Sequence, residues 1–385
     1  MKKIEVHNRC SDFNSYRAAR VKSMFNAEFG ANFDLAAELP ADNPGWRLGI
    51  IVGPSGSGKT SLGKQFWEGV PIYNYNDGWD HDAPIIDCIA PDGDFNQVTG
   101  ALAAVGLGDV PAWLRPYHAL SNGEKFRAGL ARVIAEAPGR VIIDEFTSVI
   151  DRQIARFGAL AFAKAWKRLA KEGGNQCVLL SCHRDILEWL EPDWVFDTAT
   201  GSYSERRLRR PEFTLEVWKT GWNYWRVFEP HHYLKIAPMV AAKCYVGTVN
   251  GQMVCHVAMG CKNKGKDVEA RGCRLVVMPE WQGAGVGIRF LNHVCQLNLE
   301  GAEGGRFPGR PVTTIFHTSH PGLCMALRRD GKWRQVSAVL YGANKKRCTA
   351  SIRRSAIARG SDIVINTSGY GGHFRAIQGF RYIGA

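Results

Sequence analysis

The sequence predicts an α/β protein of two domains, and three observations support this prediction. The 385 residues are too many for one ordinary core, and 45% hydrophobic with 22% charged residues is typical of a folded soluble chain. The apolar run at 48–52 reads as a strand that enters a glycine-rich turn and a helix. The same order returns at 276–290. Such a turn favours bound phosphate. The sequence therefore contains two candidate phosphate sites, and each needs its own explanation.

Several classes of protein are disfavoured by the composition. No apolar run approaches the roughly 20 residues that a membrane-spanning helix needs, and the first ten residues lack the apolar core of a signal peptide. The eleven cysteines are scattered, without a CxxC pair or a Cys/His cluster at zinc-ligand spacing. We therefore expect a cytoplasmic protein with reduced thiols, no membrane partner and no structural metal.

The net charge of +13 is unevenly distributed along the chain. Residues 1–200 contain 21 Lys+Arg and 25 Asp+Glu, a balance of −4, whereas residues 201–385 contain 28 and 11, a balance of +17. Clustered Lys and Arg side chains neutralise backbone phosphates, so this asymmetry favours a polyanionic partner for the second half. The alternative, in which the basic residues only keep that half soluble, stays open.

The first glycine-rich turn is a strong nucleotide signal. Residues 53–60, GPSGSGKT, satisfy the pattern G-x-x-x-x-G-K-[ST] after an apolar strand. Its glycines let the backbone wrap the phosphates, Lys59 neutralises β/γ-phosphate charge, and the Thr60 hydroxyl can bind Mg²⁺. The predicted ATP-binding residues of this turn are Gly53, Ser55, Gly56, Ser57, Gly58, Lys59, Thr60 and Ser61.

Further motifs follow in the stretch 120–151, LSNGEKFRAGLARVIAEAPGRVIIDEFTSVID, and in VLLSCHRD. Together they resemble the signature, Walker B, D-loop and switch motifs of ATP-binding-cassette (ABC) ATPases. In that resemblance Asp144 assists Mg²⁺, Glu145 polarises the attacking water and His183 contacts the γ-phosphate. The remaining nucleotide contacts that it implies come from Ser121, Gly123 and Asp151.

The resemblance covers about residues 45–200 and departs from the family pattern at two signature positions. Asn122 replaces a glycine and Glu124 a glutamine, and Gln97 is the nearest candidate for the Q-loop residue. In this family the signature of one subunit closes over the P-loop of another, so the resemblance implies an ATP-dependent homodimer. Without a membrane span, it favours the soluble members, which act on DNA, RNA or ribosomes.

The second half begins after a polar, basic segment, and we place the domain boundary near residue 205. The stretch 241–260 reads as two strands joined through Asn250-Gly251, the strongest short hairpin signal. Hairpin, strand, glycine-rich turn and helix, in this order, resemble the GNAT acyltransferases with their [R/Q]-x-x-G-x-[G/A] motif. The predicted fold is thus α/β: a P-loop ABC-type ATPase domain in 1–205, then a GNAT-like α+β domain in 206–385.

The GNAT resemblance implies that the second turn holds the pyrophosphate of an acyl-coenzyme A, with acetyl-CoA as the expected donor. The backbone of the preceding strand then lies along the pantetheine arm. The predicted donor-binding residues are Val276, Val277, Gln282, Gly283, Ala284, Gly285, Val286 and Gly287. Glycine suits this turn because the backbone must approach an anion without a Cβ in the way. The alternative is a flexible, glycine-containing turn between strand and helix that binds no ligand.

A narrower resemblance concerns the acceptor. The His-Tyr-Leu at 232–234, the second turn and the C-terminal TSGYGGHFRAIQGFRYIG are similar to Mom-like GNAT proteins of phages, which modify adenine N6 in DNA. This resemblance implies catalytic or positioning roles for His232, Tyr233, Ser368 and Tyr370. The tryptophans and tyrosines of 216–235 are core residues by default, although they could also stack on bases.

A basic run is the best candidate for a surface that contacts nucleic-acid phosphates. Its residues are Lys345, Lys346, Arg347, Arg353 and Arg354. A solvated helix face is the alternative interpretation. The acceptor-side strand and helix can be assigned either to 312–336 or to 362–384, and the general base is left open.

The function that these patterns favour is an ATP-dependent acyltransferase that modifies a base of DNA, rather than RNA, at an exocyclic amine. Two other functions stay open. The second domain could acylate a protein or a small amine under control of the ATPase, or it could be a non-catalytic binding module on an ATPase that acts on nucleic acid.

Overall fold

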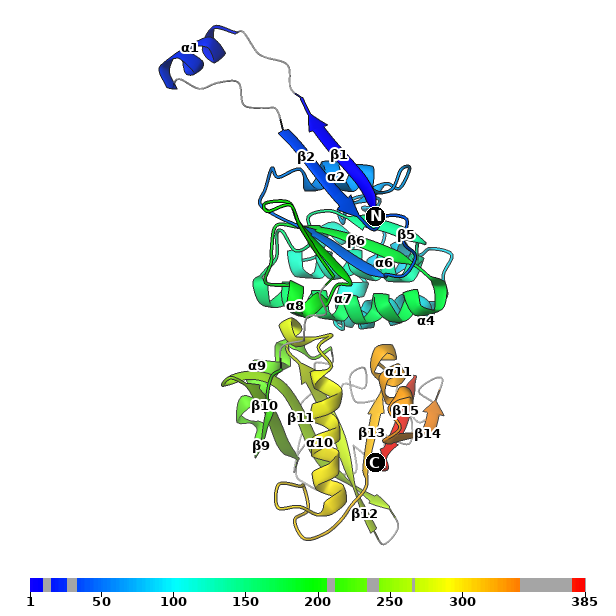
Figure 1. The fold of residues 1–385 in the computed structure, drawn as a ribbon. Coiled ribbons are helices and arrows are strands. Elements are labelled where there is room, and N and C mark those ends of the chain that lie inside the picture. Colours follow the sequence, from blue (N-terminus) through cyan, green and yellow to red (C-terminus); the bar gives the residue numbers. More distant parts are fainter. Residues whose placement is uncertain are drawn as a thin grey trace. The chain divides into compact units, whose positions relative to one another are not determined.

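The computed structural model describes residues 1–9, 15–25, 33–205, 212–233, 242–264, 267–339 and 376–384. By its packing the chain divides into two compact units (Figure 1). The first contains 1–79 and 136–211, and the second contains 80–135 and 212–385. This division concerns packing alone, and the predicted domain boundary near residue 205 stays a prediction.

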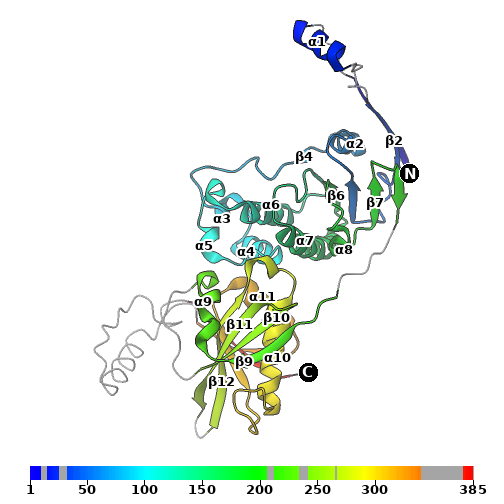
Figure 2. The same cartoon turned by 90° about the vertical axis from the view of Figure 1, so that its left-hand side faces the viewer.

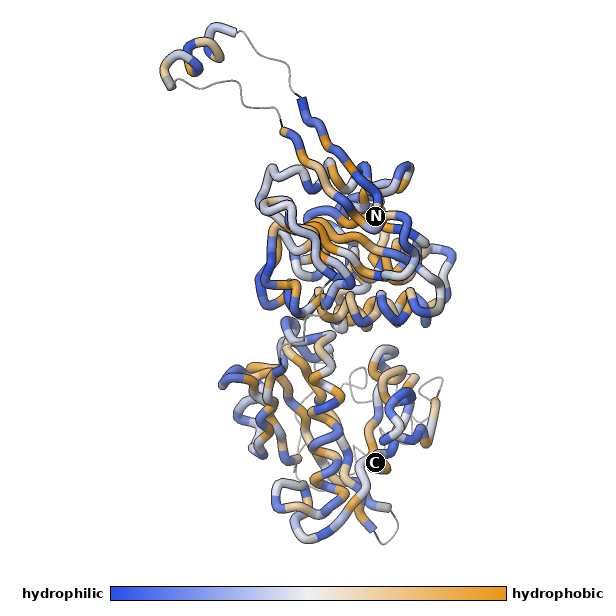
Figure 3. The backbone as a smooth tube through the Cα atoms, in the orientation of Figure 1, coloured by the Kyte–Doolittle hydropathy of each residue, from blue (hydrophilic) through white to orange (hydrophobic). Residues whose placement is uncertain are grey.

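The first unit contains a six-stranded sheet of order β4-β5-β6-β3-β7-β8, parallel except for the antiparallel pair β7–β8. Its strands are β3 (Leu48–Val52), β4 (Ile72–Tyr73), β5 (Arg140–Ile143), β6 (Gln176–Ser181), β7 (Trp194–Asp197) and β8 (Ser202–Ser204). Strands β3 and β6 are buried along their whole length, as continuous apolar runs in parallel sheets usually are. Figure 3 shows apolar residues concentrated along these central strands.

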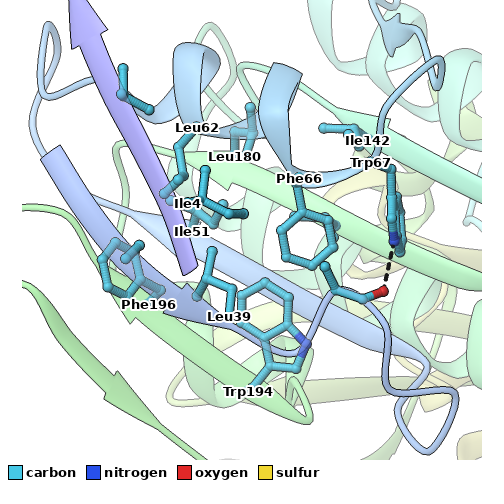
Figure 4. Close-up of a cluster of buried hydrophobic side chains, with 14 of the residues drawn as sticks. Ile4, Leu39, Ile51, Leu62, Phe66, Trp67, Ile142, Leu180, Trp194 and Phe196 are labelled. Atoms are coloured by element: carbon cyan, nitrogen blue, oxygen red, sulfur yellow. Dashed lines mark hydrogen bonds between the residues drawn. The ribbon is translucent and has the colours of Figure 1, made fainter. Parts of the chain in front are cut away.

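A second, two-stranded sheet and four helices complete this unit. They are β1 (Lys2–Asn8), β2 (Phe33–Leu39), α1 (Tyr16–Phe25), α2 (Lys59–Phe66), α7 (Arg152–Gly173) and α8 (Leu187–Leu190). Apolar side chains of β1, β2, α2 and the large sheet meet in one core, drawn in Figure 4. A Cβ at Gly49 would lie 2.1 Å from the Trp194 ring, so only glycine allows this close packing. The core thereby holds β3, whose end enters the first glycine turn.

The second unit contains a seven-stranded sheet of order β14-β15-β13-β12-β11-β10-β9. Its strands are β9 (Glu216–Thr220), β10 (Lys243–Val249), β11 (Gln252–Lys264), β12 (Asp267–Val277), β13 (Thr314–Thr318), β14 (Trp333–Val339) and β15 (Ile377–Tyr382). Every neighbouring pair is antiparallel except β12–β13, which is parallel. The predicted hairpin is confirmed, because Asn250 and Gly251 form the two-residue turn of β10–β11 at φ 48° and 77°.

Strand β12 is bent where the second candidate site begins. Its register with β11 shifts at a bulge, and Arg274 adopts φ 56°, a conformation in which bulges re-aim a strand. Strand β13 pairs with β12 only along Ala270–Gly272. Beyond Gly272, therefore, the parallel strands β12 and β13 separate. The carboxyl-terminal part of β12 no longer pairs with β13.

Helices of this unit cover the sheet. They include α9 (Trp225–Phe228), α10 (Val286–Glu300) and α11 (Pro321–Arg329), with 3-10 turns η2 (Trp222–Tyr224), η3 (Glu229–His231) and η4 (Pro279–Trp281). Helix α10 lies against β11, β12 and β13, as Figures 1 and 2 show. The stretch 312–336 forms β13, α11 and the first part of β14, whereas the C-terminal stretch contributes β15 between β13 and β14.

The segment 80–135 packs with the second unit although it lies between two parts of the first in sequence. It contains α3 (Ile85–Cys88), α4 (Phe95–Ala104), α5 (Val110–Trp113), η1 (Tyr117–Ala119) and most of α6 (Asn122–Glu136). Its main neighbour is α11, which packs on α4. Among the helices that the structure describes, none has the length and apolar character needed to cross a membrane.

Candidate functional site

The first glycine turn joins β3 to α2 and surrounds a lysine. Gly56 and Gly58 adopt φ 77° and 83°, the left-handed conformation that glycine adopts without strain. The Lys59 Nζ donates to the carbonyl oxygens of Gly53 at 2.9 Å and Pro54 at 2.6 Å, so the ammonium group lies inside the turn. Positive charge and a cradle of main-chain amides are the features that bind the phosphates of a nucleotide.

Oxygen atoms suited to Mg²⁺ lie beside this turn. The Thr60 hydroxyl donates to Asp144 Oδ2 at 2.7 Å. Hydroxyl and carboxylate oxygens are the ligands that Mg²⁺ takes, usually together with phosphate oxygens. Within the described ranges, no group of three or more His, Cys, Asp or Glu could hold a metal ion.

The backbone after β5 is strained where the predicted catalytic acid lies. Glu145 and Thr147 adopt φ 50° and 70°, a left-handed conformation that is uncommon for residues with a Cβ. The Glu145 N–H donates to Asp144 Oδ1 at 2.7 Å, and the Phe146 N–H to the Leu180 carbonyl at 2.9 Å. These bonds hold the segment in place despite the strain.

The predicted switch histidine lies at the end of β6, the strand next to β5. His183 Nδ1 is 3.4 Å from Thr147 Oγ1, and its N–H donates to Ser181 Oγ at 3.1 Å. Burial and the nearby Arg152 guanidinium lower the pKa of His183, so the ring is neutral at pH 7. Asp151 caps α7, because its Oδ1 accepts from the Gln153 N–H at 2.8 Å.

Two further residues near the first turn carried no recognisable pattern in the sequence. Asn74 follows β4, which pairs in parallel with β5, so it lies beside Asp144 at the same edge of the sheet. Phe33 begins β2, and a Cβ at Gly58 would lie 2.4 Å from its ring. Strand β4 has only two residues, too few to show a periodicity.

The signature residues Ser121 and Gly123 lie at the start of α6, in the second unit. The Ser121 N–H donates to Glu124 Oε2 at 2.8 Å, and the Glu124 N–H donates to Ser121 Oγ at 3.4 Å, which is the reciprocal geometry of a capping box. Glu124, the departure from the family's glutamine, thus stabilises the start of this helix. Gln97 Nε2 donates to the Ala135 carbonyl at 2.8 Å and so joins α4 to α6.

The second glycine turn joins η4 to α10. Gly283 and Gly285 adopt φ 88° and 81°, and a Cβ at Gly287 would lie 2.8 Å from the Val277 side chain. Gln282 Nε2 donates to the Val277 carbonyl at 3.0 Å, which holds the turn against β12. The first N–H groups of the 15-residue helix α10 have no intrahelical acceptors and could bind an anion.

A cavity of about 720 Å³ lies beside this turn, and most of the predicted donor- and acceptor-side residues in the described part of the chain line it. They are His232, Tyr233, Val276, Val277, Gln282, Gly283, Gly285, Val286 and Gly287. Ala284 is buried and does not contribute to the lining. Residues from three separate stretches of the sequence are therefore brought together as a ligand site requires.

His232 and Tyr233 enter the cavity from an aromatic cluster. The two rings stack with centroids 5.0 Å apart, and His232 also contacts the Trp225 ring at 5.6 Å. Trp225 and Phe228 are buried in the core of this unit, with Trp218, Trp222 and Tyr224 packed against them. Trp225 and Phe228 are therefore core residues, as the default interpretation has it, whereas the other three are half-buried.

Other lining residues were not predicted from the sequence. Lys262, Arg271 and Arg274 add positive charge on β11 and β12. From β13 and its end come His317 and His320, and from β12 Cys273, whose thiol pKa is raised by burial. The sequence pattern that could have indicated these cations is the alternation of side chains between the two faces of β12. In the strand register, Arg271 lies opposite Gly260 of β11.

The predicted basic run Lys345, Lys346, Arg347, Arg353 and Arg354 lies outside the described residues, as do Ser368 and Tyr370. Their roles stay predictions.

Comparison with known proteins finds solved structures that are similar in fold. No protein-family model matches the sequence, and no curated protein matches it. A dimeric bacterial ABC transporter cassette is 15% identical, with 43% of this chain and 84% of that one covered and a TM-score of 0.33. The same cassette in a post-hydrolysis state with ADP and Pi is 15% identical, with 46% and 89% covered and a TM-score of 0.34.

A third similar structure is cbiO1 from Clostridium perfringens, part of the ABC transporter complex cbiONQ. It is 18% identical, with 44% of this chain and 80% of that one covered and a TM-score of 0.31. These likenesses concern the fold of that part of the chain, and at such scores they carry no further argument. The function must therefore be inferred from the residues themselves.

Proposed function

We propose that the chain is an ABC-type ATPase joined to an acyl-CoA-dependent transferase that acylates an exocyclic amine of a nucleic-acid base. DNA is the expected nucleic acid and adenine N6 the expected acceptor. One observation supports this proposal above the others: the predicted donor turn, the strand before it and His232–Tyr233 line one cavity. The ATPase part is supported by the groups gathered around the first turn.

In the ATPase, each group around the first turn has a separate task. Lys59 neutralises phosphate charge, while Thr60 and Asp144 hold Mg²⁺, which withdraws charge from the transferred phosphoryl group. Glu145 orients and polarises the attacking water, and neutral His183 can donate a hydrogen bond to the γ-phosphate. Asn74 follows β4 at the edge of the sheet where Asp144 follows β5, and its amide is a further candidate ligand. The resemblance implies that two copies of the chain sandwich the nucleotide.

In the transferase, the parted strands β12 and β13 supply the donor site. Main-chain groups of 274–277 no longer pair with β13 and can hydrogen-bond the extended pantetheine arm. The glycines of the second turn let its amides contact the pyrophosphate. The part of this turn is to bind and orient the donor.

The acceptor enters from the side of His232 and Tyr233. The base amine attacks the thioester carbonyl, the amine loses a proton, and the coenzyme A sulfur leaves and is protonated. An amine inside a duplex cannot reach such a cavity, so the base must be flipped out or the strands opened. Lys262, Arg271 and Arg274 give the cavity a positive rim that suits the phosphates of the displaced strand.

Mass spectrometry of nucleosides from cells that express the full chain tests this function. We expect a new acylated adenosine-type nucleoside in DNA, absent with Gly285→Glu and absent with Tyr233→Ala. Acylation of protein instead of DNA by the purified chain would support the amine-acyltransferase alternative. Acyl-CoA binding without any product would support the non-catalytic binding module.

Binding to nucleic acid can be separated from catalysis in the same protein. Replacing Lys345, Lys346, Arg347, Arg353 and Arg354 with alanine should weaken binding to all sequences and flatten its salt dependence. His232→Ala should leave binding unchanged and abolish the product. Full-chain binding that does not respond to salt would direct the search to proteins and small amines.

A further inference from the structure

The end of α4 and the turn after it form one wall of the donor cavity. Ala103, Ala104, Gly106 and Gly108 line the cavity together with the second glycine turn, although they belong to the ATPase half of the sequence. We propose that this segment, 103–108, is part of the acyl-CoA site, and that Arg127 on α6 is the residue that positions it. The proposal rests on the proposed function, because it assumes that the cavity takes an acyl-CoA.

The wall touches the second glycine turn through main-chain atoms. The Gly108 N–H donates to Gln282 Oε1 at 3.0 Å. A Cβ at Gly106 would lie 2.5 Å from the Gln282 carbonyl oxygen, so the two backbones are as close as glycine allows. Since Gln282 also holds Val277, a shift of the wall reaches both the turn and β12.

A histidine fixes the other side of the wall. His320 Nδ1 accepts from the Leu323 N–H at 3.2 Å, so the neutral ring carries its proton on Nε2. Its Nε2 then donates to the Gly108 carbonyl at 3.0 Å. Helix α11, which His320 caps, packs closely on α4, because a Cβ at Gly322 would lie 2.2 Å from Ala103 Cβ.

Arg127 connects this wall to the signature helix. Its side chain is only 4% exposed, and its Nη1 donates to the Gly106 carbonyl at 3.0 Å. Its Nη2 donates to the Pro279 carbonyl in η4 at 2.6 Å. Burial lowers the Arg127 pKa to about 10, and the group is still charged at pH 7. One buried cation therefore ties α6, the wall and the entrance of the second glycine turn together.

The position of Arg127 on α6 gives the connection a functional consequence. It lies three residues after Glu124, within the first turns of the helix that begins at the signature. A helix moves as a rigid element, so a nucleotide that engages the signature displaces Arg127 and, with it, the wall. Linkage then requires ATP to change acyl-CoA affinity and acyl-CoA to change ATP affinity by the same factor.

The first test moves the wall without touching the turn. Gly106→Ala places a Cβ against the Gln282 backbone. Gly309→Ala also places a Cβ on a residue with positive φ, but there the Cβ meets no neighbouring atom. In calorimetric titrations of the full chain with acetyl-CoA, we expect an affinity at least tenfold lower for Gly106→Ala and unchanged for Gly309→Ala. Equal affinity in both variants and the parent overturns the proposal. A parent that binds no acetyl-CoA overturns the proposed function as well.

The second test measures the linkage and also serves if Gly106→Ala does not fold. In a Glu145→Gln background, acetyl-CoA affinity is titrated with and without Mg-ATP. In the parent, we expect Mg-ATP to change the acetyl-CoA affinity at least threefold. Arg127→Met should still bind ATP but lose this change in affinity. Arg132→Met, on the same helix, should keep it. A merely structural arginine would alter affinity but leave this factor intact, and a persisting factor in Arg127→Met overturns the positioning role.

Discussion

The two glycine turns have nearly the same backbone and different surroundings. Gly58 and Gly285 both precede a helix at φ 83° and 81°. Around the first turn stand a lysine, two carboxylic acids and a histidine, whereas the second is bordered by an amide side chain and main-chain atoms. Similar turn backbones can therefore lie in different chemical surroundings, which are set by the neighbouring elements.

The sheets explain the difference in surroundings. In the first unit, β3, β5 and β6 run parallel, so their carboxyl ends bring Asp144, Glu145 and His183 to one edge with the turn. In the second unit, β12 has an antiparallel neighbour on one side and a parting parallel neighbour on the other. An open cleft results there, instead of a cluster of acids.

The largest expected effect concerns Glu145, the acid predicted to polarise water beside the first turn. Glu145→Gln should slow ATP hydrolysis about 10³-fold, because the carboxylate that polarises water is lost. ATP binding should remain and hold the homodimer together, whereas Lys59→Ala should abolish binding. Phosphate release and size-exclusion chromatography with ATP measure both. Hydrolysis at the parental rate in both variants would make the two turns alike and end the ATPase assignment.

A smaller effect is expected at the second turn. Gly285→Glu places a side chain and a negative charge where pyrophosphate should bind, so acetyl-CoA affinity should fall at least about 100-fold. Gly309→Glu, at φ 73° in open space, is the matched control. ATP hydrolysis should be unchanged in both variants. An unaltered calorimetric titration of Gly285→Glu would remove the transferase reading of the second turn.

The strands that lead to the two turns should respond differently to pH. The Nδ1–H of His256, a buried residue of β11, donates to the Arg274 carbonyl oxygen at 3.1 Å, and burial lowers the pKa of His256 to about 4. The unfolded ring takes up a proton near pH 6.5 and the folded one does not. Stability is therefore lost as pH falls from about 6.5 towards 4, by roughly 2 kcal/mol between pH 7 and 5.

Hydrogen exchange corrected for intrinsic rates measures this difference. As the pH is lowered, the opening free energy of peptides from β12 should decrease in the parent. In His256→Gln it should hardly change. Peptides from β3 serve as the internal reference, because that strand has no ionisable side chain. An equal pH response in parent and variant would show that His256 does not cause it.

The smallest expected effect concerns the amide beside Asp144. Asn74→Ala should raise the Mg²⁺ concentration for half-maximal ATP hydrolysis about tenfold, because groups near a metal typically tune its affinity by this amount. Gln97→Ala, the candidate nearest in the sequence, should leave this concentration unchanged. The opposite result would support Gln97 as the Q-loop residue.

Local patterns in the sequence predicted the parts of both sites that depend on neighbouring residues. Positive φ requires glycine, so Gly56, Gly58 and Gly285 could be recognised from spacing alone. Two residues with a strong turn preference specified the β10–β11 hairpin in the same way. Continuous apolar runs indicated β3 and β6 because strands buried on both faces cannot alternate.

The amino-acid sequence by itself thus determined the two glycine turns and the acids that follow the strands, because both are properties of short segments. Tertiary structure alone decided what faces each turn. Asn74 comes to the same sheet edge as Asp144 through the pairing of a two-residue strand, and Arg127 reaches Pro279 across 152 positions. Such partners meet because sheets and helices pack over long distances in the chain, and no local periodicity records which segment will lie opposite another.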